Sequence, residues 1–184
     1  MGKILAIREV GDPVLAKKAE EIDTKKIDQE VLDIIEDLKA TLEFSAGFGI
    51  AAPQVGISKK IIVIEIEKEK CGYADCEDVP NTVMINPTWK PLSDKTSVEF
   101  EACLSVPTIR GKVKRYQEIE VTYYTQTGEK VTKQVHGFTA RDIQHECDHL
   151  EGMVFLDKVE SPGGFATINT IRKFDLKKQK GGER

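Results

Sequence analysis

The segment QHECDHLEG, residues 144–152, constrains the fold and chemistry of this chain more than any other stretch. His145 and His149 are four residues apart, so on a helix they lie on one face, one turn from each other. Two imidazoles in that arrangement can bind one metal ion, and the adjacent Glu146 would project beside the metal rather than onto it. A carboxylate placed there can take a proton from a water molecule held by the metal. The alternative, a surface helix carrying these residues by chance, is disfavoured because two of the three histidines fall at ligand spacing.

A catalytic site of this kind needs a third protein ligand and one open coordination position. In the metzincin pattern the third ligand is a histidine three residues beyond the glycine, but here that position is Phe155. A thermolysin-like site would use a downstream glutamate; Glu160 lies in a turn-like stretch and Glu183 at the end of the chain. The third ligand is therefore expected upstream of the helix.

Upstream, Cys103 is the favoured third ligand. It lies in FEACLSVP, at the end of an extended segment that can aim its side chain. A thiolate is a strong ligand for soft and borderline metals. Taken alone, a cysteine here would more often be a small buried hydrophobic residue. His136 is the rival ligand, since it is the remaining histidine and closely precedes the helix.

A third segment with functional character is GFGIAAPQVG, residues 47–56. Its small residues, Gly49 among them, allow a substrate backbone to come close. The side-chain amide of Gln54 could donate a hydrogen bond to a developing oxyanion. A plain glycine-rich turn is an equally reasonable interpretation of this segment on physical grounds alone.

The hydrophobic pattern predicts an α+β fold with a mainly antiparallel sheet around a central metal-binding helix, and with an N-terminal helix. The predicted helices are 26–45 and 139–151, the second ended by Gly152. The predicted strands are 60–66, 82–86, 97–104, 118–125 and 130–136, the last two forming a hairpin around Thr127 and Gly128. We expect residues 1–184 to form a single domain whose basic tail, 171–184, is partly frayed.

Composition excludes several classes of protein. The 184 residues are 40% hydrophobic and 32% charged with a net charge of −4, which fits an ordinary core and gives no reason to expect DNA binding. No apolar run is long enough for a membrane span, and the start lacks a secretory signal, so a cytoplasmic location is expected. Four reduced thiols are then expected, with Cys71 and Cys76 in an exposed loop.

The segments GFGIAAPQVG, EACLSVP and QHECDHLEG, in this order, resemble the peptide deformylase family, which removes the formyl group from the N-terminal methionine of new bacterial or organellar proteins. The resemblance also covers GDPVL near the start, INP at 85–87 and Arg110-Gly111. The resemblance implies that the metal ligands are Cys103, His145 and His149 and that the catalytic base is Glu146. It implies that the oxyanion accepts hydrogen bonds from the Gln54 side chain and the Leu104 N–H. The expected substrate-binding residues are Gly49 and Ile50. Ala102 stands where the family usually has glycine, which leaves substrate preference open, and Ile50 replaces a commoner leucine.

The resemblance implies Fe²⁺ as cofactor, with Zn²⁺ or Ni²⁺ able to occupy the same site. Its implied partners are formyl-methionyl nascent peptides, with no DNA and no membrane. A transient ribosome contact through the basic tail is a further hypothesis; the lysines concerned are Lys173, Lys177, Lys178 and Lys180. The alternatives are a metalloendopeptidase and a non-enzymatic metal-binding protein. Asp148 is expected to be a structural partner of Arg115, with Arg141 as the alternative, and not a metal ligand.

Overall fold

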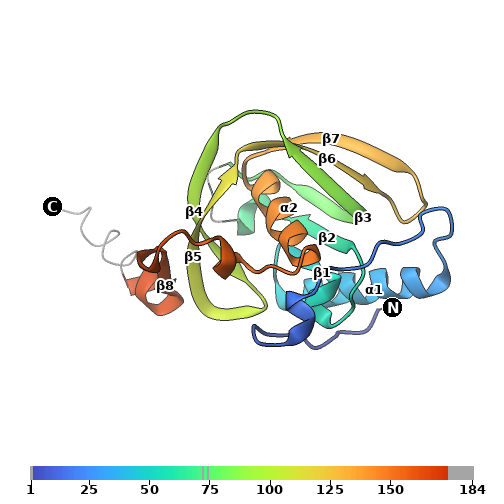
Figure 1. Cartoon of the computed structure of the whole chain (residues 1–184), viewed down its shortest axis with the longest axis horizontal. Coiled ribbons are helices and arrows are strands. Elements are labelled where there is room, and N and C mark those ends of the chain that lie inside the picture. Colours follow the sequence, from blue (N-terminus) through green and yellow to red (C-terminus); the bar gives the residue numbers. More distant parts are fainter. Residues whose placement is uncertain (1, 72, 74, 174–184) are drawn as a thin grey trace.

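Two antiparallel sheets lie on either side of the central helix α2 (Gly137–Leu150) in the part of the chain that the structure describes, residues 2–71, 73 and 75–173 of a computed structural model (Figure 1). The first sheet has the order β1 (Gly49–Ala51), β2 (Ile61–Ile66), β3 (Val79–Pro91), β6 (Glu118–Tyr124) and β7 (Lys130–His136). The second has the order β4 (Thr96–Cys103), β5 (Val106–Tyr116) and β8 (Phe165–Thr167). Outside the sheets lie the helix α1 (Gln29–Ser45) and the 3₁₀ turns η1 (Pro13–Ala16), η2 (Ala52–Val55), η3 (Lys68–Lys70), η4 (Phe155–Lys158) and η5 (Pro162–Gly164).

The α+β class with a mainly antiparallel sheet is confirmed, and so is the hairpin, whose strands pair from Glu118 with His136 to Tyr124 with Lys130. The first helix begins at Gln29, three residues later than predicted, because the Asp28 side chain accepts a hydrogen bond from the Val31 N–H and caps it. The second helix starts at Gly137, two residues earlier than predicted.

The prediction missed strand β5, which pairs with β4 along most of its length. The inward positions of β5 include Gly111 and Arg115, which are buried but not hydrophobic. The alternation of apolar and polar residues that marks a half-buried strand is therefore weak in this segment. Arg115, which weakens the hydrophobic pattern of this strand, also holds Glu101 in the site described below.

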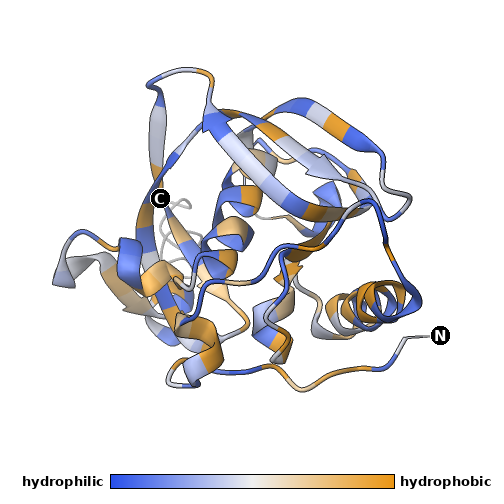
Figure 2. Ribbon diagram, turned by 45° about the vertical axis from the view of Figure 1, so that its right-hand side comes forward, coloured by the Kyte–Doolittle hydropathy of each residue, from blue (hydrophilic) through white to orange (hydrophobic). Residues whose placement is uncertain are grey.

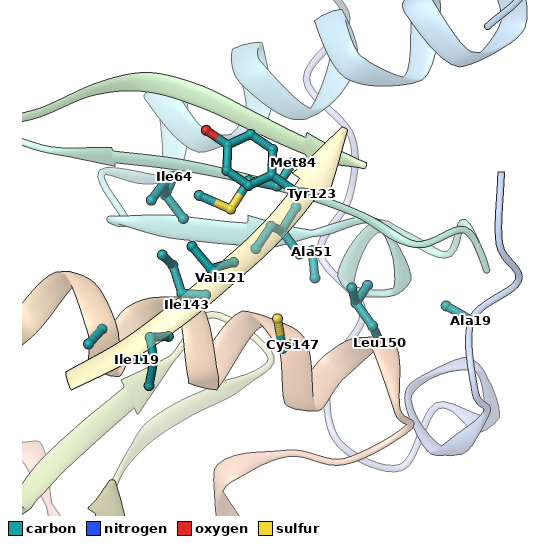
Figure 3. Packing of buried hydrophobic residues seen from close by; sticks show 12 residues of the cluster. Ala19, Ala51, Ile64, Met84, Ile119, Val121, Tyr123, Ile143, Cys147 and Leu150 are labelled. Carbon is teal, nitrogen blue, oxygen red and sulfur yellow. The ribbon is translucent and has the colours of Figure 1, made fainter. Parts of the chain in front are cut away.

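Strand β2 is apolar along nearly its whole length because helices cover both of its faces. Ile61 and Val63 pack in the cluster that contains Leu38 of α1. Ile62 and Ile64 pack on the other face, against α2. Figure 3 shows Ile143, Cys147 and Leu150 pointing from α2 into this second cluster. The position of α2 is thus fixed by an apolar stripe buried against the five-stranded sheet.

The opposite side of α2 is polar, and Figure 2 shows hydrophilic and hydrophobic residues side by side along this helix. Even so, twelve of its fourteen residues, Phe138–Arg141 and Ile143–Leu150, are buried. Buried polar side chains need hydrogen-bond partners. The three-stranded sheet supplies them, as the site shows.

The expectations for Cys71 and Cys76 were wrong. Cys76 is 4% exposed and packs with Ile66 and Phe138, and its sulfur is joined to that of Cys71 in a disulfide. The charged residues on either side of the two cysteines predict an exposed loop, and sequence spacing alone does not reveal that Cys76 packs against Phe138 of α2.

No helix among the described residues is both long enough and apolar enough to cross a membrane. Residues 174–184, with Lys177, Lys178 and Lys180 of the basic tail, lie outside the described residues.

Candidate metal centre

Helix α2 holds His145 and His149 one turn apart, with ring centroids separated by 5.1 Å and planes 80° apart. The Cys103 Sγ lies 3.3 Å from His149 Nε2. One ligand atom from each of these three residues lies within 4.8 Å of the others. Metal–nitrogen and metal–sulfur bonds of about 2.0–2.3 Å would fit inside a triangle of that size. The donor set, one thiolate and two imidazoles, therefore fits a single divalent ion.

Strand β4 carries Cys103 to the site. The side chains of Glu101 and Cys103 are buried and that of Ala102 between them is exposed, as the alternation of a strand requires, and the pairing of β4 with β5 shifts register between Glu101 and Cys103. Burial alone would raise the pKa of the Cys103 thiol, but His149 and His145 beside it lower that pKa well below its ordinary value. A cysteine held this way is ready to bind metal as a thiolate.

Glu101 orients the first histidine. Its Oε2 lies 2.9 Å from His145 Nδ1, so that nitrogen donates to the carboxylate and Nε2 is left free to bind metal. Arg115 donates to both oxygens of the same carboxylate, from Nε and from Nη2, at 2.9 Å each. Burial opposes ionisation of Glu101, but Arg115 and His145 hold its pKa well below the usual range.

Arg115 and Arg141 tie the two sides of the site together. Arg115 also donates from Nη1 to Asp148 Oδ2 at 2.5 Å, which confirms the predicted structural partner of Asp148. Arg141 instead donates from Nη1 to Glu101 at 2.8 Å and to the Val113 carbonyl at 3.0 Å. These side chains are all less than one-tenth exposed, so the network is shielded from solvent.

Glu146 lies beside the ligands with an oxygen, Oε2, that is buried and has no hydrogen-bond partner within the described residues. Burial raises its pKa well above the ordinary value, and the nearby carboxylate of Asp142 adds to the rise. Burial also raises the pKa of Asp142 to about 7. A carboxylate with a free oxygen and a raised pKa suits a general base that works near neutral pH.

Glycine at position 49 is required by this arrangement. A Cβ atom on Gly49 would lie 2.8 Å from Glu146 Cγ and Oε1 and 2.9 Å from Asp142 Oδ2, closer than atoms can pack. Gly49 lines the cavity. The side chain of Ile50 is fully buried in the core beyond it, so only the backbone of Ile50 could face a ligand.

Gln54 points its amide group at Cys103, one of the three candidate metal ligands. Its Oε1 accepts a hydrogen bond from the Ala51 N–H at 2.8 Å, which fixes the orientation of the amide. Its Nε2 is consequently turned toward Cys103 Sγ, at 3.5 Å, and Ser105 Oγ, at 3.3 Å. Leu104 follows Cys103 in the turn between β4 and β5 and lines the same cavity.

These groups surround a cavity of about 330 Å³ that is open to solvent. The rival ligand His136 does not reach it, because its side chain is 62% exposed and lies 3.8 Å from Glu77. Sequence reasoning missed several residues that line the cavity, among them Tyr73, Glu101 and Asp142. Glu101 had a usable signal, since an acid two residues before Cys103 shares its face of the strand.

A buried Cys-His-His set with a carboxylate beside it and an open cavity in front is the arrangement of a hydrolase that uses one metal ion. Comparison with known proteins gives the family. The family described as Polypeptide deformylase matches residues 4–163. The chain belongs to this family, which confirms the resemblance seen in the three segments, and it is a hydrolase that removes the formyl group from an N-terminal methionine.

Named relatives agree with this membership. Peptide deformylase 1A, chloroplastic/mitochondrial, of Arabidopsis thaliana is 40% identical over 170 residues, which cover 88% of this chain and 63% of that longer protein. Peptide deformylase 2 of Ralstonia nicotianae is 38% identical over 157 residues, which cover 85% of this chain and 88% of that protein. The Met-Ala-Ser-bound crystal structure of a class I type b peptide deformylase from Acinetobacter baumannii superposes with a TM-score of 0.79 at 33% identity, covering 86% of this chain and all of that one.

Proposed function

We propose that Cys103, His145 and His149 bind one Fe²⁺ ion, for which Zn²⁺ or Ni²⁺ can substitute, and that Glu146 is the general base of deformylation. A metal ion held there would polarise the formyl carbonyl and lower the pKa of a water molecule. The observation that carries the proposal is the ligand triangle with the free Glu146 oxygen beside it.

In this mechanism Glu146 takes a proton from the attacking water and passes it to the leaving amine, giving formate and a free methionine amine. The Gln54 amide and the Leu104 N–H donate hydrogen bonds to the oxyanion that forms at the formyl carbon. The hydrogen bond from the Ala51 N–H to Gln54 supports this role, because it orients the amide before substrate arrives.

The substrate is the formylated N-terminus of a newly made polypeptide, with its backbone passing Gly49 and Ile50 and its first side chain in the cavity. The presence of Met-Ala-Ser in the Acinetobacter baumannii structure supports a peptide of this kind. We place the enzyme in the cytoplasm, where nascent chains are found.

A further hypothesis is that the basic tail contacts ribosomal RNA. It is tested by measuring ribosome binding at low salt after deletion of residues 177–184.

Two rival functions make different demands on the site. A metalloendopeptidase would cleave an internal peptide bond and leave formyl-Met-Ala-Ser intact. A structural metal site would be closed by a fourth protein ligand. Within the described residues no fourth His, Cys, Asp or Glu joins Cys103, His145 and His149, which supports an open catalytic position.

The decisive experiment is turnover of formyl-Met-Ala-Ser by Glu146→Ala, with metal content measured on the same sample. We expect bound metal and fold to be retained and kcat to fall on the order of 10²–10⁴-fold. Glu160→Ala, at an exposed glutamate, is the control and should behave like the wild type. Near-normal turnover by metal-loaded Glu146→Ala would remove Glu146 from the mechanism.

A further inference from the structure

Tyr73, in the segment between η3 and β3, lines the cavity. Cys71 and Cys76 are joined by a disulfide, and Cys76 is buried against Phe138 at the start of α2. Asp75 touches the same end of the helix, because a Cβ atom on Gly137 would lie 2.7 Å from the Asp75 carbonyl oxygen. Asp75 and Cys76 therefore hold their side of the segment against the start of α2, and the disulfide ties Cys71 to it.

Tyr73 lies between the two cysteines and reaches into the cavity. Its ring stacks on Phe138 with centroids 4.6 Å apart and planes 28° apart. Phe138 in turn meets Phe48 edge-on at 5.2 Å. All three rings line the cavity that also contains His145 and Glu146. This end of the cavity is aromatic, whereas the metal end is ionic.

The hydroxyl of Tyr73 donates a hydrogen bond to the backbone carbonyl of Phe100. Phe100 belongs to β4, three residues before Cys103. Tyr73 thus connects the disulfide-bonded segment with the strand that carries a metal ligand. Removing its ring would open the aromatic end of the cavity without touching the ligands.

We propose that Tyr73 is a specificity-determining residue, which closes the side-chain pocket to a size that fits methionine, and that the Cys71–Cys76 disulfide holds it there. This inference rests on the proposed function, since the cavity must receive the first side chain of a formyl peptide. Aromatic rings suit a thioether, because sulfur makes favourable contacts with them. A rigid wall also excludes side chains larger than methionine, since a packed ring cannot move aside without losing its contacts.

The test is the ratio of kcat/KM for formyl-Met-Ala-Ser to that for formyl-Phe-Ala-Ser. Tyr73→Ala should lower this ratio roughly 10-fold or more, a size typical of altered pocket contacts, mainly through KM. Tyr73→Leu provides a second variant if the alanine form does not fold. Tyr73→Phe retains the ring and should stay close to the wild-type ratio. Phe165→Ala, a partly exposed aromatic of β8 outside the cavity, is the matched control.

A wild-type ratio in folded, metal-loaded Tyr73→Ala and Tyr73→Leu would overturn the assignment of Tyr73. Absence of wild-type turnover with every formyl peptide would instead reject the proposed function, so the two failures are distinct. The disulfide is tested by Cys71→Ser/Cys76→Ser, whose ratio should fall between those of the wild type and Tyr73→Ala. An unchanged ratio in this double variant would show that the disulfide does not position Tyr73.

Discussion

The two sides of α2 are buried by different kinds of interaction, one apolar and one ionic and polar. Toward the five-stranded sheet the helix presents Ile143, Cys147 and Leu150, which pack against apolar strand residues. Toward the three-stranded sheet it presents Arg141 and His145, which meet charged and polar groups of β4 and β5. Both sides are buried, so the difference lies in the kind of interaction and not in the degree of exposure.

Apolar packing is non-directional and scales with the area removed from water, so it fixes where the helix lies. The ionic side is directional, because each hydrogen bond restricts the orientation of both partners. Glu101 needs Arg115 and Arg141 to remain ionised in a buried place, and only an ionised, fixed Glu101 orients the His145 ring. The apolar side thus contributes stability, whereas the ionic side contributes the geometry of the candidate metal site.

Breaking the ionic side should have the largest effect. Arg115→Met leaves the Glu101 and Asp148 carboxylates without their main partner, and removal of one member of a buried ion pair costs about 3–5 kcal/mol. Loss of the support for His145 should also weaken metal binding about 10–100-fold. Urea unfolding and metal titration measure the two effects. Lys114→Met, at the exposed neighbour on β5, is the control.

The pH dependence of stability should separate the two sides further. The folded-state pKa of Glu101 lies below its unfolded value, so between these values the unfolded chain binds more protons and stability rises with pH. The contribution is complete above the ordinary glutamate pKa of about 4.3 and is lost as pH falls below it. Metal-free Glu101→Gln should be about 2–3 kcal/mol less stable than wild type at pH 7. A gap that stays constant from pH 7 to pH 3 would contradict this.

The apolar side should respond in stability alone. Ile143→Val removes one buried methyl group and should cost about 1 kcal/mol. Since Ile143 faces the five-stranded sheet, we expect metal affinity and kcat per bound metal to stay unchanged (Figure 3). Thermal unfolding and formyl-peptide kinetics on one preparation test both statements. A large loss of kcat would show that the two sides of α2 are coupled.

The sequence predicts the local part of this arrangement well and the non-local part poorly. His145, Glu146 and His149 follow from spacing on one helix, which needs no knowledge of the rest of the fold. Cys103 could be named because the helix lacked a ligand and because the surrounding segment resembles a family. The hairpin and the α+β class follow from periodicity and turn residues, which are also local signals.

The residues that the sequence did not reveal depend on contacts between distant segments. Glu101 becomes an orienting group only when β4 meets α2, and Tyr73 becomes a cavity wall only when its segment folds onto Phe138. Strand β5 was not predicted because its inward-facing Arg115 forms its ion pairs with residues 14 and 33 positions away in the sequence. From sequence alone a charged residue is predicted to be exposed, because charged side chains are seldom buried without a partner and the partner is not known.

Substitution of Cys147 should have the smallest effect on stability and turnover. Cys147 and Cys103 are both buried thiols, one on each side of α2, so they can be compared directly. Cys147 lies on the apolar side, where burial raises the pKa of its thiol; Cys103 lies on the ionic side, where His149 and His145 overcome the effect of burial and lower it. Cys147→Ala should therefore change stability by about 1 kcal/mol or less and leave turnover intact.

In metal-free protein, iodoacetamide should label Cys103 well before Cys147, because the thiolate is the reactive form and Cys103 lines the cavity. Peptide mapping by mass spectrometry gives the order, and saturation with Zn²⁺ should protect Cys103 while leaving Cys147 as unreactive as before. Labelling of Cys147 first would mean that the apolar side opens more readily than the metal site, and that packing against the five-stranded sheet is not what holds α2 in place.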